Sequence, residues 1–594
     1  MTPESESPAS ELEQNLERLN ALIPRLVKAM EKRRLRDPRL EGLDHDVHVK
    51  AAAAYLTEMV NDPARLIESQ VRFWGESLRN WAEVQNRRDV AEDGSKPDRP
   101  DSGAPTDRRF ASGHWDSHPY FDLIRRQYLL SSETLRSSTA ELNALDPKDR
   151  DQVNFILRQF TDMMAPTNFL ATNPEALEKA VQSNGRSLVD GLENFVRDLE
   201  ASPDGLSITL SDPEAFTVGT DLATTEGSVV FQNRLFQLIQ YTPLTDKVYR
   251  TPLLIIPPWI NKYYILDLRA KNSFIRYAVE QGRTVFVVSW ANPDESFRDV
   301  GLDTYLAEGF LTALGTVQSV TRTRRVDVVG YCVGGTLTAC GLAYLAATGG
   351  ANRVRKATFL TALTDFEHPG ELGVFINDSV IDGIRSDVSS RGYMDGYFMA
   401  RTFSFLRAND LVYGPAVRSY LLGEKPPAFD LLHWNGDSTN LPARMIIEYL
   451  EQLYRDNDLA NDRLQLLGSP LRLSDIRTQL FAVATIADHI APWKSSFAGL
   501  AKTSGDKTFV LAESGHIAGI VNPPNRKKYG HWTNVAPPDD PDEWKRGAEF
   551  HPGSWWPRWN AWLADGDSPR SKPRTPGTDR FPEIEPAPGT YVRQ

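Results

Sequence analysis

Cysteine is scarce in this chain: only Cys332 and Cys340 occur among its 594 residues. A disulfide-rich domain is therefore excluded, and we expect a reducing, cytoplasmic compartment. No group of histidines, cysteines and carboxylates has the spacing of metal ligands, so we expect no metal. Basic charge is not in excess either, because 67 Lys and Arg stand against 79 Asp and Glu and give a net charge of −12. This balance argues against nucleic-acid binding through a broad basic surface.

Long apolar runs are also missing, although one stretch imitates them. Residues 328–352 carry no charged side chain, but they contain six glycines and follow a β-branched run. A membrane span needs about 20 predominantly apolar residues. The glycines favour a buried strand, a tight turn and a buried helix instead. We therefore expect no transmembrane segment.

The chain is long enough for more than one domain. Residues 1–205 show helical spacing and predict a mainly helical N-terminal domain, with a disordered linker at about 89–109 that is rich in Pro, Gly, Ser and charge. In residues 206–594, short β-rich runs alternate with helical stretches, which predicts an α/β fold with a parallel sheet. The β signal lapses at about 370–442, where we expect a cap or lid insertion over an active site.

The sharpest motif is a strand-like run that ends in Gly-x-Cys-x-Gly at residues 326–334. It has the pattern of a nucleophile elbow, with Cys332 where serine usually stands. The glycines are needed because larger side chains would collide around the strained turn. The following helix start favours a thiolate at Cys332, and the Val333 amide can donate to an oxyanion. A buried structural cysteine is the alternative, and Cys340 is interpreted as core.

An α/β-hydrolase fold needs an acid and then a histidine after its nucleophile, in that chain order. Asp488 and His516 each come just after a strand-like segment. We predict that Asp488 accepts a hydrogen bond from His516 and that His516 is the base. His489 is the competing base, but as the direct neighbour of Asp488 it should point elsewhere.

At these residues the chain resembles the poly(3-hydroxyalkanoate) synthases, polymerases that build bacterial storage polyester from hydroxyacyl-CoA. The resemblance extends from about residue 107 to 592, and its specific runs include APTNFLATNPEA (165–176), PPWINKYYILDL (257–268), FSFLRANDLV (403–412), FDLLHWNGDSTNLP (429–442) and GHIAGIVNPP (515–524). The length and the extra N-terminal region resemble the single-subunit class I type, which prefers short-chain monomers. One departure is Tyr-Gly-Pro-Ala-Val at 413–417, where the family usually has aromatic and Asn residues.

The resemblance implies an α/β-hydrolase fold in which Cys332 carries the acyl chain, with Asp488 and His516 as its partners. The implied substrate is an (R)-3-hydroxyacyl-CoA such as 3-hydroxybutyryl-CoA. No cofactor is implied, since coenzyme A is part of the substrate and a product. The resemblance further implies a homodimer that works in the cytoplasm on a growing polyester chain at a granule surface.

Two further residues are interpreted as substrate-binding. Arg407 is a candidate contact for the phosphates of coenzyme A, and a salt bridge within the cap is its alternative. Asp267 follows the run PPWINK, beside the second oxyanion-hole position, and a purely structural role is equally open.

Other functions and roles stay open at this point. A thioesterase or another cysteine-dependent hydrolase would use the same elbow, and an inactive granule-binding scaffold would not need it. Near the N-terminus, apolar residues recur every three or four positions, and Pro24 should kink or split the helix that they predict. This apolar stripe could pack on the catalytic domain, bind the granule or hold a partner; its members are Leu12, Leu16, Leu19, Ile23, Leu26 and Met30.

Overall fold

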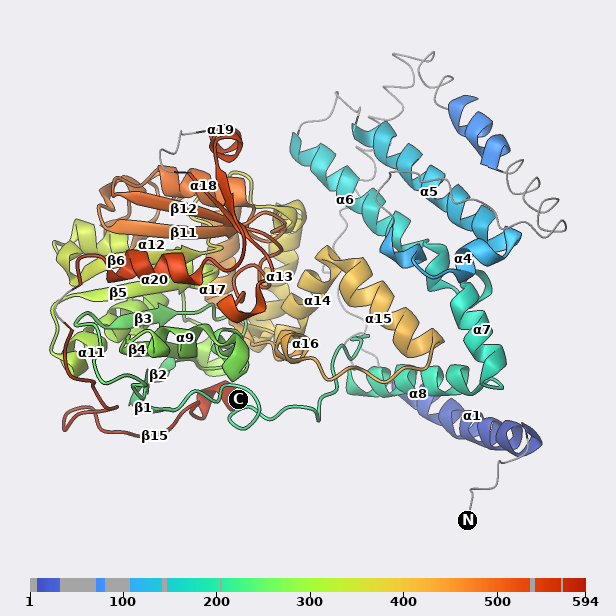
Figure 1. Ribbon diagram of the computed structural model, residues 1–594, viewed down its shortest axis with the longest axis horizontal. Coiled ribbons are helices and arrows are strands. Elements are labelled where there is room, and N and C mark those ends of the chain that lie inside the picture. The colour runs from blue at the N-terminus through green and yellow to red at the C-terminus, as the bar shows by residue number, and fades with distance from the viewer. Residues whose placement is uncertain are drawn as a thin grey trace. The chain divides into compact units, whose positions relative to one another are not determined.

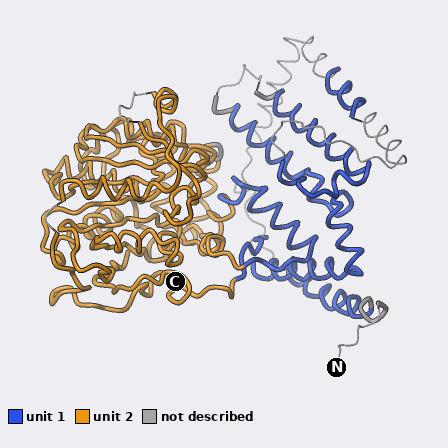
Figure 2. The backbone as a smooth tube through the Cα atoms, in the orientation of Figure 1, with its two compact units in different colours: residues 1–212, 403–427 blue, residues 213–402, 428–594 orange. Residues whose placement is uncertain are grey.

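The computed structural model describes residues 8–31, 71–80, 107–140, 147–202, 206–534, 540–567 and 570–594. The chain divides into two compact units, residues 1–212 with 403–427 and residues 213–402 with 428–594 (Figure 2). The linker expected at about 89–109 lies outside the described residues as far as residue 106.

The described part of the first unit is mainly helical (Figure 1). Their bounds are α1 (Pro8–Glu31), α4 (His114–Ser117), α5 (Pro119–Ala140), α6 (Pro147–Met163), α7 (Pro174–Gln182), α8 (Arg186–Ala201) and α15 (Gly414–Ala416), and residues 71–80 are also helical. Helix α1 continues through Pro24, so the proline does not split it. Leu22 of α1 packs against Val189 and Val196 of α8. Among the described side chains of the predicted apolar stripe, only Leu26 is placed against this cluster, whereas Leu16, Ile23 and Met30 are exposed. The packing of α1 on α8 therefore runs through Leu22, outside the stripe, and the role of the stripe stays a prediction.

Residues 403–427 belong to this helical unit, although the sequence predicts them inside the cap insertion at 370–442. Gly191 explains how α8 accommodates them, because a Cβ at that position would collide with the carbonyl oxygen of Tyr420. The Tyr420 hydroxyl also donates to the carboxylate of Asp198, which lies further along α8, at 2.8 Å. The predicted insertion is thus divided between the two units.

The second unit is built on one large sheet. In the described residues its eleven strands lie in the order β14 (Glu549–His551), β13 (His531–Thr533), β12 (Lys507–Ala512), β11 (Gln479–Thr485), β6 (Val354–Leu360), β5 (Val326–Tyr331), β3 (Leu253–Ile256), β4 (Val285–Trp290), β2 (Phe236–Tyr241), β1 (Gly227–Gln232) and β15 (Glu585–Pro586). The stretch from β12 to β4 is parallel, and the strands beyond it on both sides pair antiparallel. Two short pairs stand apart, β9 (Gln465–Leu466) with β10 (Ser469–Pro470) and β7 (Tyr393–Met394) with β8 (Leu441–Pro442).

Helices connect and cover these strands. Their bounds are α9 (Phe274–Glu280), α10 (Leu302–Thr304), α11 (Thr312–Thr321), α12 (Val333–Ala347), α13 (Asp378–Arg391), α14 (Gly396–Leu406), α16 (Asp430–Gly436), α17 (Ala443–Glu448), α18 (Trp493–Ala501), α19 (Pro541–Arg546) and α20 (Trp556–Ala564). Helices α9 and α20 pack on the same face of the sheet, the near face in Figure 1. The uncharged stretch 328–352 is a buried strand, turn and helix, as predicted. Across the described ranges, no helix combines the length and apolarity needed to cross a membrane.

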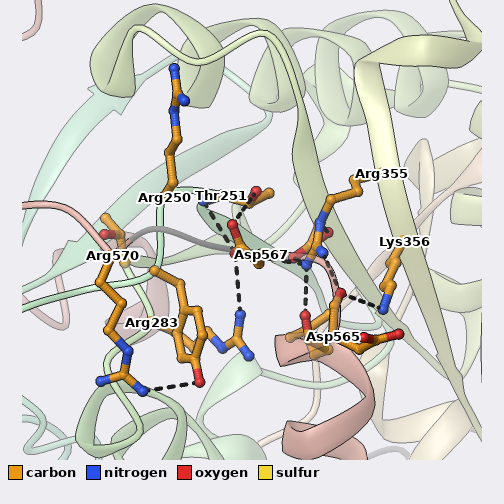
Figure 3. Close-up of polar contacts among 12 residues, drawn as sticks. Arg250, Thr251, Arg283, Arg355, Lys356, Asp565, Asp567 and Arg570 are labelled. Carbon is orange, nitrogen blue, oxygen red and sulfur yellow. Dashed lines mark hydrogen bonds and ion pairs between the residues drawn. The ribbon is translucent and has the colours of Figure 1, made fainter.

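Asp567 ties the amino-terminal ends of several strands to the chain that follows α20 (Figure 3). Its carboxylate accepts the Thr251 hydroxyl, just before β3, at 3.1 Å. It also forms ion pairs with Arg283, just before β4, at 3.6 Å and with Arg355 of β6 at 3.8 Å. Arg355 in turn pairs with Asp327 of β5. These contacts fix one edge of the sheet, and the opposite strand ends lead into the candidate site.

Candidate active site

Cys332 occupies the turn between β5 and α12, with φ 53° and ψ −125°. A positive φ is uncommon for a residue with a side chain, so the turn is strained. The Cys332 amide is held by a 2.9 Å hydrogen bond to the carbonyl of Leu360 on β6. A side chain at Gly330 would press against the start of α12, and one at Gly334 would collide with the carbonyl of Ile256 at the end of β3. This is the strand–turn–helix geometry of a nucleophile elbow.

The start of α12 offers amide donors beside Cys332. Val333 is the first helical residue, and the first amides of a helix have no acceptor within it. The loop after β3, residues 257–262, is here called the β3 loop, and its start lies against Gly334. Pro257 and Pro258 have no N–H, so the Trp259 amide is the first donor that follows β3. In this fold, an amide after the nucleophile and one from such a loop form the oxyanion hole.

The ring of His516 is hydrogen-bonded to the carboxylate of Asp488. His516 follows β12 and Asp488 follows β11, so the parallel sheet brings both to the strand ends that also carry Cys332. The distance from His516 Nδ1 to Asp488 Oδ2 is 2.8 Å, and both side chains are buried. Because a carboxylate only accepts, Nδ1 carries the proton and Nε2 is left for Cys332. The pairing predicted from sequence is present, and His489 does not take this position.

The Asp488 carboxylate is fixed on both of its oxygens. Oδ1 accepts the amides of Ile490 and Ala491 at 2.9 Å each. Oδ2 accepts the Thr485 hydroxyl at 3.3 Å in addition to His516. Four donors therefore hold the carboxylate in one orientation, and sequence reasoning did not identify Thr485 as one of them.

The groups around His516 favour its protonated form. Burial works to lower its pKa, but the negative charges of Asp488 and Cys332 and hydrogen bonds to both outweigh burial and raise the pKa to about 10. The ring of Tyr331 stacks on the imidazole at 5.7 Å between centroids and 25° between planes. The site thus favours an imidazolium between a carboxylate and a sulfur that can bear negative charge.

Sequence reasoning did not identify two tyrosines near Cys332. Tyr449 and Tyr454 belong to the π-helical turn Tyr449–Arg455, and burial, with a smaller contribution from the charge of Cys332, raises the pKa of both. Their rings pack on each other at 5.3 Å, and Tyr454 packs on Phe366 at 4.9 Å. Side chains five residues apart share a face only where a helix widens to i→i+5 bonds. The sequence spacing is visible, but the widening is not.

Arg407 lies in the helical unit, on residues 403–427. Its guanidinium pairs with the carboxylate of Asp410, with Nε 3.0 Å from Oδ2, and the pair is largely exposed. A salt bridge is therefore present, but it lies in the helical unit and not in a cap as the sequence-based alternative had it. A contact to the phosphates of coenzyme A stays a prediction.

Asp267 is buried beneath the turn that follows the β3 loop. Its carboxylate accepts the hydroxyls of Thr225 and Ser273 at 2.6 Å each. Burial raises its pKa, and these hydroxyls oppose the rise. The partners support the structural alternative over a substrate contact, because they tie the segment before β1 to the start of α9.

The fold and site together define an α/β-hydrolase fold with a cysteine at the nucleophile elbow, followed by an acid and a histidine in the order that the fold requires. The family model described as alpha/beta hydrolase fold matches residues 251–523. A second family model, described as the N-terminus of poly-beta-hydroxybutyrate polymerase, matches residues 106–278.

Relatives narrow this class. The poly(3-hydroxyalkanoate) polymerase of Methylorubrum extorquens is 42% identical over 537 residues, which cover 90% of this chain and 88% of the relative. The polymerase subunit PhaC of Rhizobium meliloti is 40% identical, with coverage of 92% and 88%. That of Cupriavidus necator is 41% identical over 562 residues, with coverage of 93% and 91%. The chain belongs to the poly(3-hydroxyalkanoate) polymerase family and is an acyltransferase.

Proposed function

We propose that this enzyme polymerises (R)-3-hydroxyacyl-CoA, with 3-hydroxybutyryl-CoA as its short-chain substrate, and releases coenzyme A. Family membership supports the polymerisation of hydroxyalkanoate units into polyester. The observation that carries the residue roles is the buried hydrogen bond from His516 to Asp488 at the strand ends beside Cys332. The proposal includes a homodimer that acts in the cytoplasm at the granule surface.

In the first half-reaction, the Cys332 thiolate attacks the carbonyl carbon of the substrate thioester. The carbonyl oxygen becomes an oxyanion, to which the Val333 amide and an amide of the β3 loop donate. When the intermediate collapses, the bond from carbon to the sulfur of coenzyme A breaks, and the His516 imidazolium gives its proton to the leaving thiolate. The acyl group is then a thioester on Cys332, and His516 is neutral.

In the second half-reaction, the 3-hydroxyl of another hydroxyacyl group attacks the acyl-Cys332 carbonyl. His516 takes the hydroxyl proton through Nε2, a new ester bond forms, and Cys332 leaves as a thiolate. Asp488 holds the imidazole in the tautomer that this transfer needs. Because the acyl group passes from one thioester to another, it stays activated until the hydroxyl attacks. Attack by water would waste it, so buried surroundings such as the Tyr449 and Tyr454 pair suit the reaction.

The test is release of coenzyme A from 3-hydroxybutyryl-CoA by wild type, Cys332→Ala and Cys340→Ala, with the product analysed by size. We expect polymer from wild type and from Cys340→Ala, since Cys340 is a buried core residue of α12. Cys332→Ala should lose polymer formation and release of coenzyme A by a factor of at least about 10³, because no nucleophile remains.

Other outcomes would contradict the proposal. Free 3-hydroxybutyrate in place of polymer would make the enzyme a thioesterase. Full polymer formation by Cys332→Ala would remove Cys332 from the chemistry. Sedimentation velocity on the same wild-type preparation reports the oligomeric state, and a monomer at every active concentration would contradict the homodimer.

A further inference from the structure

Three carbonyl groups of the β3 loop accept hydrogen bonds from one short segment of the chain, and a fourth, that of Pro257, accepts the indole N–H of Trp290 at 2.8 Å. The carbonyl of Trp259 accepts the Thr439 hydroxyl at 2.6 Å. The next carbonyl, of Ile260, accepts the Thr439 amide at 3.3 Å. The carbonyl of Lys262 accepts the indole N–H of Trp434 at 2.7 Å. One short segment, residues 434–439, therefore fixes three of the loop's peptide groups.

A charged contact adds to these bonds. Asp437, within the same segment, accepts Lys262 Nζ at 2.7 Å on one oxygen and the Tyr264 hydroxyl at 2.8 Å on the other. Lys262 is a buried residue, and its ammonium also donates to the carbonyl of Gln594 at 2.8 Å. Asn261 and Ser438 form a bridge between the two backbones. The β3 loop and the segment 434–439 are therefore joined by both backbone and side-chain contacts.

The direction of each loop carbonyl also fixes the direction of the N–H group in the same peptide. A trans peptide is planar, and its N–H points opposite to its C=O. Because the Trp259 carbonyl faces Thr439, the N–H of Ile260 points away from that segment. Thr439 is buried, and its hydroxyl and amide together hold two successive peptide planes. The other end of the loop is fixed by the close approach of Ile256 and Pro257 to the start of α12.

We propose that Thr439 is a positioning residue for the oxyanion hole. Its hydroxyl sets the orientation of the peptide between Trp259 and Ile260, so that the Ile260 amide and the Val333 amide face the same carbonyl oxygen during acylation of Cys332. This inference rests on the proposed function only in assuming acyl transfer to Cys332. As a positioning residue, Thr439 acts through its hydrogen bonds to the loop.

The test compares two reactions of the same sulfur. Acylation by 3-hydroxybutyryl-CoA develops an oxyanion, whereas alkylation by iodoacetamide forms the carbon–sulfur bond with loss of iodide and develops none. In Thr439→Val, which lacks the hydroxyl at nearly the same volume, single-turnover acylation should fall about 10- to 100-fold. The alkylation rate should stay within about twofold of wild type, as should KM. Thr439→Ser keeps the hydroxyl and should restore acylation.

Thr321→Val is the matched control for losing a buried hydroxyl. Thr321, on α11, donates to the carbonyl of Val317 at 2.6 Å and has no part in the loop. In Thr321→Val, the rates of acylation and alkylation of Cys332 should equal those of wild type. A Thr439→Val variant that is acylated at the wild-type rate would overturn the proposal. An alkylation rate that falls as much as the acylation rate would also overturn it, because the substitution would then have disturbed Cys332 or His516 itself. A wild type that acylates but releases monomer would instead defeat the polymerase function and leave the Thr439 comparison intact.

Discussion

His516 sits between two groups of negative charge, and its titration depends on both. Asp488 holds Nδ1 at 2.8 Å, and the Cys332 sulfur is the partner of the other nitrogen. Together they raise the pKa to about 10 against the effect of burial. The folded state therefore prefers the imidazolium. Its contribution to stability is complete below the unfolded pKa of about 6.5 and is lost as pH rises through about 10.

Removing the sulfur should lower this pKa. In Cys332→Ala, the charge and the hydrogen bond of Cys332 are both gone, while Asp488 stays. We expect the His516 resonance in a ¹³C-histidine NMR titration to shift its midpoint downward relative to wild type, and the pH window of its stabilisation to close earlier.

His531 is the internal control for that titration. It is buried in β13, and burial lowers its pKa, with Arg558 and His551 and not Cys332 as the neighbouring charges that act on it. Its midpoint should lie below the usual histidine value in both proteins and should not change between them. An unchanged His516 midpoint in Cys332→Ala would mean that the sulfur carries no charge in the resting enzyme.

At the scale of elements, Gly191 decides how α8 packs. The backbone of Tyr420 approaches α8 so closely that a Cβ at residue 191 would collide with its carbonyl. Gly191→Ala should therefore force α8 and residues 403–427 apart, at a cost of about 1–3 kcal/mol. Hydrogen exchange should report the change as faster exchange of the amides in residues 403–427.

Gly75→Ala is the matched control, because residue 75 is also a helical glycine of the same unit and nothing lies within 4 Å of an added Cβ. Alanine without a clash should stabilise its helix by up to about 1 kcal/mol. If Gly191→Ala stabilised the protein as Gly75→Ala does, the close approach would not be a constraint.

The elements also show what a sequence can and cannot predict. Cys332, Asp488 and His516 could be found because each directly follows a strand-like run, and parallel strands end at one edge of a sheet. Residues 403–427 could not be assigned, because their helical spacing suits a cap and the helical unit equally. Tertiary contacts distinguish the two, among them the close approach of Tyr420 to Gly191 and its hydrogen bond to Asp198. Tyr449 and Tyr454 depend on a local widening of the helix that spacing does not reveal.

At the scale of the whole sheet, Asp567 connects distant parts of the second unit. Its carboxylate reaches Thr251, Arg283 and Arg355, which lie at the starts of separate strands (Figure 3). Arg283 is completely buried, and burial lowers its pKa to about 10 despite the carboxylates around it. The charge on Asp567 therefore offsets a cation that has no access to water.

Asp567→Asn should destabilise the second unit strongly. The amide keeps an acceptor for Thr251 but removes the charge, and breaking a buried ion pair from one side costs about 3–5 kcal/mol. The midpoint of urea unfolding, followed by tryptophan fluorescence, should fall accordingly. Acylation per folded molecule should not change, because the cluster lies at the opposite ends of the strands from Cys332.

The exposed ion pair of Arg234 with Glu308 provides the control that distinguishes the effect of burial from the effect of losing a charge. Both side chains are about half exposed, and such surface pairs contribute about 0–1 kcal/mol. Glu308→Gln removes the same kind of charge from the same unit, so it should leave the midpoint nearly unchanged. Equal midpoints for Glu308→Gln and Asp567→Asn would mean that other carboxylates, such as Asp327, already balance Arg283. A lower midpoint for Asp567→Asn alone follows if its carboxylate is what holds the strand ends together.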